Sequence, residues 1–181
     1  MNRSIPEKWS AIKISDLLGS YPKTASIVRD DYMNGSEYPI IDQSRDFICD
    51  YTDDKSKIID IPSCIVFGDH TNFAKYINFP FARGADGTQI INSCDDRISN
   101  YLLYLHILSL PKIEQGYSRH YKFLKEQYVL VPDKATNERF NALVNDFTVK
   151  IKNNIIENCT LNRLRTWVLP LLMNGQATIS D

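Results

Sequence analysis

The pattern of hydrophobic and polar positions changes near Pro132. Before it, apolar runs are short and rich in β-branched and aromatic residues, and they are separated by turn-forming pairs such as Asn34-Gly35, Gly68-Asp69 and Asp86-Gly87. Such runs, bounded by turn residues, predict strands and tight turns. The predicted strands are Tyr38–Ile41, Ile58–Ile61, Cys64–Phe67, Gln89–Ile91 and Tyr128–Val131.

A helix is predicted within this strand-rich region, from Ile98 to Leu110. Apolar residues recur there at helical spacing, and Asp95 or Asp96 is placed to cap the helix start.

After Pro132 the apolar residues follow a period close to 3.6, which predicts a long amphipathic helix. The polar stretch 153–160 separates two apolar stripes, so two alternatives remain open: one long helix with a kink there, or two helices with a break. Pro170 should bend or fray the last turns, and Asn174-Gly175 should end the helix. The first stripe is Phe140, Leu143, Val144, Phe147 and Ile151, and the second is Leu161, Leu164, Val168, Leu171 and Leu172.

A helix of about 38 residues extends on the order of 55 Å, which is longer than a small domain is wide. Part of its apolar stripe therefore requires a second helix, although the helix folding back on its own domain is an alternative. We expect an α+β protein in which a mixed, strand-rich head (residues 1–132) precedes a coiled-coil-like helix and tail (residues 133–181). The length of 181 residues fits this organisation.

Composition argues mildly against a nucleic-acid partner without excluding one. The formal net charge is -1, whereas nucleic-acid binders are more often basic, so basic residues would have to gather on one face. The four cysteines show no C-x-x-C pair and are expected to be reduced and mostly buried. No window approaches the ~20 apolar residues of a membrane span, and a cytoplasmic protein is expected.

Residues for catalysis are sparse. The sequence contains no G-x-G-x-x-G, no Walker loop and no H-E-x-x-H. Asp50, Asp53, Asp54 and Lys55 resemble the carboxylate-plus-lysine set of a metal-dependent nuclease, but such a set recurs by chance in many loops and a solvated turn is the preferred interpretation. We therefore expect no catalytic residue, no metal and no cofactor.

Two histidines have alternative interpretations. His70 stands beside Asp69 as a general base would, but no nucleophile accompanies it. His106 lies on an apolar stretch and is predicted to be a hydrogen-bonded core histidine.

Several short motifs follow one another along the chain. They are Trp9, Ile14–Leu17, Tyr38–Gln43, Asp50–Asp54, Ile65–Thr71, Phe79–Phe81, Gly84–Gly87, Gly116–Leu124, Val131-Pro132, Leu161–Arg165 and Leu169–Gln176. In this order, the chain resembles one target-recognition domain and one spacer helix of a type I restriction-modification specificity subunit. By this resemblance Trp9 and Ile14–Leu17 are expected to belong to the opening strand region. Such subunits carry two recognition domains and two spacer helices, whereas this sequence holds one of each.

The resemblance implies a non-catalytic protein that reads double-stranded DNA in the major groove. It implies docking to methyltransferase (modification) subunits and, through them, to the restriction subunit. Each candidate DNA-binding residue could instead be a solvated surface residue or a turn former. The candidates are Lys23, Thr24, Arg45, Asp69, His70, Thr71, Lys75, Arg83, Asp86, Ser118, Arg119, His120 and Lys122.

The long helix implies an antiparallel homodimer, or pairing with a second half-subunit. An adaptor protein that uses the helix without reading DNA is the alternative function. The expected helix-pairing residues are Phe140, Val144, Phe147, Ile151, Leu161, Leu164, Val168 and Leu171.

Overall fold

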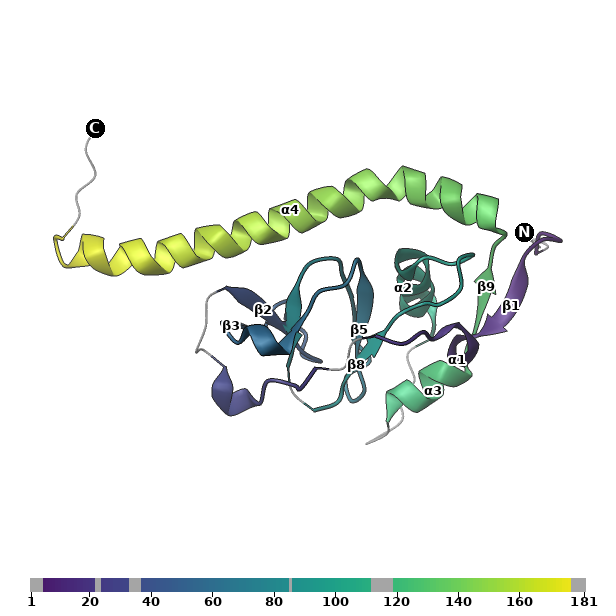
Figure 1. The fold of residues 1–181 in the computed structure, drawn as a ribbon, viewed down its shortest axis with the longest axis horizontal. Coiled ribbons are helices and arrows are strands. Elements are labelled where there is room, and N and C mark those ends of the chain that lie inside the picture. Colours follow the sequence, from purple (N-terminus) through teal and green to yellow (C-terminus); the bar gives the residue numbers. More distant parts are fainter. Residues whose placement is uncertain (1–4, 22–23, 33–36, 85, 112–118, 177–181) are drawn as a thin grey trace. The chain divides into compact units, whose positions relative to one another are not determined.

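A computed structural model describes residues 5–21, 24–32, 37–84, 86–111 and 119–176 (Figure 1). The chain forms two compact units, Met1–Leu143 and Val144–Asp181. The first unit contains every strand found among the described residues, and the second consists, in its described part, of a helix and the turn that ends it.

The centre of the first unit is a three-stranded antiparallel sheet in the order β6-β5-β8. Strand β5 (Cys64–Gly68) is buried along its whole length because it pairs on both sides, with β6 (Ala74–Ile77) and with β8 (Thr88–Ile91). Its continuous apolar run is typical of a strand covered on both faces.

A second sheet has the order β3-β2-β7-β4. Strand β2 (Tyr38–Ile41) pairs antiparallel with β3 (Asp50–Thr52) and parallel with β7 (Phe81–Arg83), which in turn pairs with β4 (Ile58–Ile59). The remaining strands, β1 (Ser10–Lys13) and β9 (Tyr128–Val131), form an antiparallel pair.

Short helices complete this unit and close its main core. Side chains from α1 (Ile14–Leu17), α2 (Asn100–Ser109) and α3 (His120–Glu126) pack with β5, β8 and β9. Two 3-10 turns, η1 (Arg29–Asp31) and η2 (Lys55–Lys57), lie in the connections. The fully buried core includes Ile14, Leu17, Ile65, Ile91, Ile98 and Leu103.

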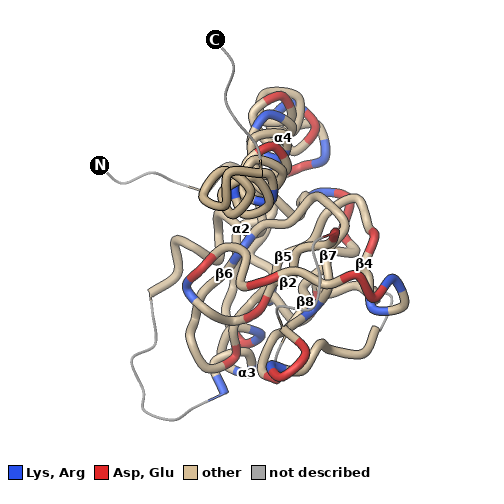
Figure 2. The backbone as a smooth tube through the Cα atoms, turned by 90° about the vertical axis from the view of Figure 1, so that its left-hand side faces the viewer, with Lys and Arg blue, Asp and Glu red and all other residues tan. Residues whose placement is uncertain are grey.

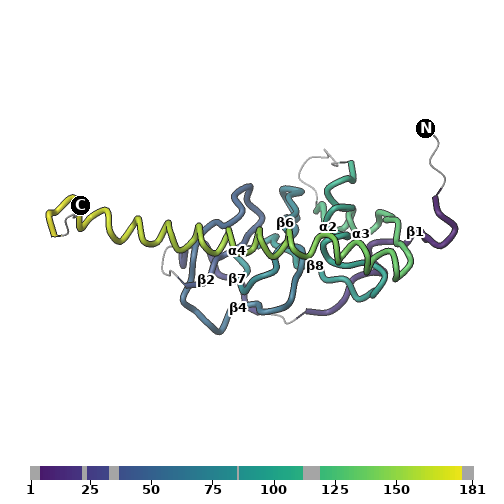
Figure 3. Tube along the Cα trace, turned by 90° about the horizontal axis from the view of Figure 1, so that it is seen from above, coloured from purple at the N-terminus to yellow at the C-terminus, as the bar shows by residue number. Residues whose placement is uncertain are grey.

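Helix α4 (Lys134–Met173) is continuous in the structure (Figure 3). The alternative of two separate helices divided at 153–160 is therefore wrong. The helix also continues through Pro170. It ends at Met173, directly before the predicted stop Asn174-Gly175, and Gly175 has a φ of 65°, in the left-handed region. The Gly175 amide donates to the Leu172 carbonyl and the Gln176 amide to that of Leu171, the bonding pattern of a Schellman cap.

The α+β class and all five predicted strands are confirmed, although the strand at Ile58 is only two residues long. Three expectations are wrong. Ile14–Leu17 is a helical turn, not part of the opening strand region, which is the neighbouring β1. Helix α2 is capped by the Ser99 hydroxyl, which accepts from the Leu102 amide at 3.3 Å, because Asp95 instead binds Arg97.

The third error concerns the cysteines. All four lie in the described part of the chain and are free thiols, but only Cys64 is buried and Cys94 is exposed. Among the described residues, no helix is both long enough and apolar enough to cross a membrane.

Candidate nucleic-acid interface

The tip of the β5–β6 hairpin presents exposed polar side chains on a well-defined turn. The amides of Thr71 and Asn72 both donate to the Gly68 carbonyl, at 3.3 and 3.0 Å, and the Gly68 amide donates to the Phe73 carbonyl. Asn72 has a φ of 59°, a conformation that asparagine tolerates better than most residues. His70 and Thr71 are exposed on this turn.

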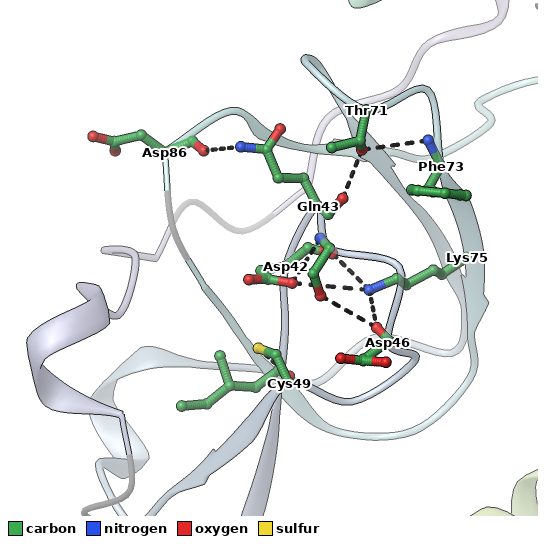
Figure 4. Close-up of polar contacts among 10 residues, drawn as sticks. Asp42, Gln43, Asp46, Cys49, Thr71, Phe73, Lys75 and Asp86 are labelled. Atoms are coloured by element: carbon green, nitrogen blue, oxygen red, sulfur yellow. Dashed lines mark hydrogen bonds and ion pairs between the residues drawn. The ribbon is translucent and has the colours of Figure 1, made fainter.

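Gln43, which directly follows the buried Asp42 after β2, joins three segments of the chain (Figure 4). Its side-chain amide donates to the Asp86 carbonyl at 2.9 Å, and its side-chain oxygen accepts from the His70 amide at 3.2 Å. Its backbone carbonyl accepts from the Thr71 hydroxyl at 2.6 Å. The segments at 43, 70–71 and 86 are thus tied together at a single residue.

Gly87 allows this close packing. Its φ is 85°, and a Cβ there would lie 2.7 Å from Cδ2 of His70 and 2.9 Å from Nε2 of Gln43. A larger residue would therefore be strained in its backbone and would push the two segments apart.

A buried lysine supports the loop that carries Gln43. The Lys75 ammonium donates to the backbone carbonyls of Asp42, at 2.8 Å, and of Asp46, and its side chain is 5% exposed. The pKa of Lys75 is lowered by burial, which the nearby Asp42 carboxylate partly opposes. Because its donors are directed inward, Lys75 shapes the loop and is unavailable to a phosphate.

Asp69 connects the hairpin tip to α3. Its carbonyl accepts from the His120 amide at 2.9 Å, and its carboxylate accepts from the Tyr121 amide at 2.8 Å. Asp69 therefore satisfies two free amides in the first turn of α3, from about fifty positions away in the sequence. Both Asp69 and His120 are buried, at 8% exposure each, so they hold the site together rather than line its surface.

Helix α3 carries the exposed basic residues next to this turn. Arg119 and Lys122 are exposed, and the Lys125 ammonium lies 5.1 Å from the centre of the Tyr121 ring. Of the candidates here, His120 and Lys122 lie within the helix, and Arg119 directly precedes it. Elsewhere the Lys/Arg and Asp/Glu positions are interspersed along the backbone (Figure 2).

The other candidates are distributed between surface and interior. Arg45 and Asp86 are exposed, and Arg45 lies in the same loop as Gln43. Arg83 is half-buried and donates to the Thr24 carbonyl at 3.4 Å. Lys23 and Ser118 lie outside the described residues. The structure therefore brings Arg45, His70, Thr71, Asp86, Arg119 and Lys122 to the surface of the hairpin, the loops tied to it and α3.

The carboxylates that resemble a nuclease site are engaged in local hydrogen bonds. Asp50 accepts from the Tyr51 amide, Asp53 from the Glu37 amide, and Asp54 from the amide and hydroxyl of Ser56. Within the described part of the chain, no group of three acidic, histidine or cysteine side chains is placed to hold a metal ion. The arrangement is that of a strand and capped turn.

The predicted helix-pairing residues fall into two groups. Phe140, in the first unit, stacks on Tyr101 with ring centres 6.3 Å apart, so it packs within its own domain. In the second unit, Phe147, Ile151, Leu161 and Leu164 are exposed in the single chain, and Val144, Val168 and Leu171 are half-exposed.

Sequence reasoning overlooked Gln43 as a functional candidate. Nothing local distinguishes this glutamine from a surface residue, since each of its partners is at least 27 positions away. A weak signal was its place directly after a buried strand, where loop residues commonly serve binding.

No protein-family model and no curated protein matches the chain. Solved structures do match. The S subunit of a type I restriction-modification system from M. genitalium superposes with a TM-score of 0.57 and 15% identity, over 86% of this chain and 42% of that one. A chain from a study of complex assembly and conformational transition of the type I R-M system gives 0.53 and 17%, over 94% and 47%. The chain spans less than half the length of these proteins, and over that span its fold is the one found in type I restriction-modification specificity subunits.

Proposed function

We propose that this chain is a non-catalytic DNA-specificity module of a type I restriction-modification system. The observation that carries the proposal is the shared fold, which extends over 86% and 94% of the chain in the two comparisons. A single head would read one half of a bipartite target, because the match covers less than half of each solved chain.

The head, residues 1–132, would make the DNA contacts. Arg45, His70, Thr71 and Asp86 supply donors and acceptors suited to base edges in the major groove. Arg119 and Lys122 would neutralise phosphates and so fix the orientation of the head on the duplex. Both kinds of contact are available on adjoining segments, since Asp69 binds the start of α3.

The helix and tail, residues 133–181, would hold the protein partners. Exposed apolar side chains at regular spacing on α4 suit pairing with a second copy or a sister half-subunit, and docking to methyltransferase subunits that recruit the restriction subunit. Such a module would act in the cytoplasm without a cofactor of its own.

Selection from a random duplex library tests the DNA-reading role. The purified chain should enrich one short sequence, or two copies of it at fixed spacing if the chain pairs with itself. Titration of the enriched duplex against a scrambled one at fixed salt should then show tighter binding to the enriched sequence.

An adaptor without DNA reading is the second candidate. The net charge of -1 and the exposed apolar residues of α4 favour it. Failure to enrich any sequence, together with retained binding to a methyltransferase subunit of a type I restriction-modification system, would support the adaptor and contradict the DNA-reading role.

A further inference from the structure

Gln43 occupies the point where the three exposed segments of the proposed interface meet. Its side-chain amide donates to the Asp86 carbonyl (Figure 4), and its side-chain oxygen accepts from the His70 amide. Both bonds go to the backbone, so they fix the course of both segments without depending on which side chains these carry. We propose that Gln43 is a positioning residue that determines sequence specificity: it holds the loop tips in the geometry that matches base edges. This inference rests on the proposed DNA-reading function.

A primary amide is suited to this role because it donates and accepts at the same time. The Asp86 carbonyl requires a donor and the His70 amide requires an acceptor, and Gln43 supplies both from one planar group. The third bond, from the Thr71 hydroxyl to the Gln43 carbonyl, ties a second residue of the hairpin tip to Gln43.

The loop beneath Gln43 is held independently of its side chain. Lys75 binds the backbone on both sides of Gln43, at Asp42 and Asp46, and the Ser44 amide donates to the Asp42 carboxylate at 2.8 Å. Removing the Gln43 amide should therefore release the segments at 70 and 86 while the 42–46 loop keeps its fold. Gln43 itself is half-buried, so its substitution leaves the core intact.

Specific and non-specific binding respond differently to such a release. Attraction to phosphates tolerates loose loops because it depends mainly on charge, whereas base-edge hydrogen bonds require fixed donors and acceptors. Loops that must be ordered on binding also lose affinity to that ordering. A positioning residue therefore affects discrimination and leaves background affinity unchanged.

The test compares Gln43→Leu with Gln89→Leu, a matched control at a half-buried glutamine in β8. For Gln43→Leu we expect about a tenfold loss of affinity for the duplex selected by the unmodified protein, and a change within about twofold for a scrambled duplex. Gln43→Glu keeps the acceptor for the His70 amide but loses the donor for the Asp86 carbonyl. Its affinity for the selected duplex should lie between that of the unmodified protein and that of Gln43→Leu. Gln89→Leu should leave both affinities unchanged.

A second measurement needs no DNA. Amide hydrogen exchange of His70 in the free protein should become about tenfold faster in Gln43→Leu, since its acceptor is gone. The positioning role would be overturned by any of three results for Gln43→Leu: an equal loss of affinity for the selected and the scrambled duplex, an unaltered preference between these duplexes, or an unaltered exchange rate of the His70 amide. If the unmodified chain prefers no duplex at all, the proposed function fails first, and that result is seen before any variant is made.

Discussion

At the scale of residues, burial separates the candidates that can touch DNA from those that cannot. Lys75, Asp69 and His120 have the polar chemistry of contact residues, yet each is at least 92% buried and bound to backbone or to a neighbouring loop. Arg119 and Lys122 have similar chemistry and are exposed. The difference arises from tertiary contacts between distant segments, which a sequence pattern does not contain.

Arg119→Ala and Lys122→Ala should each weaken duplex binding to a similar extent for every sequence. Each change removes one phosphate contact, so the slope of log affinity against log salt should fall by about 1. Titrations at several salt concentrations measure it. Lys57→Ala is the control, because the Lys57 ammonium already pairs with Asp54 at 3.4 Å. A slope that stays the same in Arg119→Ala would remove Arg119 from the interface.

His106 should make the fold sensitive to mild acid. Burial lowers its pKa below 6.5, and a hydrogen bond with the Leu130 backbone opposes this only in part. Between the folded pKa and 6.5 the unfolded chain binds more protons, so the free energy of unfolding should decrease as the pH falls through that window. The slope for one proton cannot exceed about 1.4 kcal/mol per pH unit.

Urea unfolding at several pH values from 8 to about 5 measures this slope. His106→Gln should flatten it, and an unchanged slope in that variant would contradict the assignment. The carboxylates of Asp54, Asp95 and Asp133 also have shifted pKa values, but these are lowered by hydrogen bonds, so their stabilisation is lost only below about pH 4.

At the scale of elements, the sequence predicted what local patterning controls. Strand β5 was visible as a continuous apolar run, and the end of α4 as Asn174-Gly175. Strand β6 was missed because the buried Lys75 interrupts its apolar alternation. Helix α3 was missed because its cap is supplied by Asp69 of another loop. The candidate interface was predictable in its residue types and not in its geometry, since Gln43 acts entirely through distant partners.

The first turn of α4 is anchored by one buried side chain. Asn137, 4% exposed, accepts from the Ser99 amide at 3.2 Å and donates to the Asp96 carbonyl at 3.0 Å. Asn137→Ala should therefore lower the free energy of unfolding by about 2 kcal/mol, because it removes two part-buried hydrogen bonds made by a buried side chain.

Urea unfolding followed by circular dichroism tests this anchor. Asn141→Ala, one turn further along the same helix at a half-buried asparagine, is the matched control and should change stability by less than about 0.5 kcal/mol. Equal effects of the two substitutions would show that the side-chain bonds of Asn137 contribute little.

At the scale of the whole molecule, the described part of the second unit, residues 144–176, has no hydrophobic core of its own. Its helix leaves Phe147, Leu161 and Trp167 more than half exposed, and one helix cannot bury its own stripe. Apolar groups at this spacing on α4 are expected to associate with another helix.

Light scattering from about 1 to about 100 μM should therefore show dimers, whose fraction rises with concentration. Leu164→Glu should shift the chain to monomer, because it places a charge in the paired surface, whereas Asn162→Glu on a polar position of the same helix should not. A chain that remains monomeric at the highest concentration would contradict pairing with itself and leave a sister half-subunit as the partner.

The convergence of three loops on one glutamine has a consequence for how such a reader changes its target. Because Gln43 bonds to main-chain atoms of the segments at 70 and 86, substitution of the exposed side chains of His70 and Asp86 leaves these two bonds in place. Substitutions at these tips, and at Arg45 nearby, can be sampled on a frame kept by Gln43, Gly87 and Lys75. If the chain reads DNA as proposed, one substitution at an exposed tip position should change the recognised sequence while the backbone of the three loops stays in place.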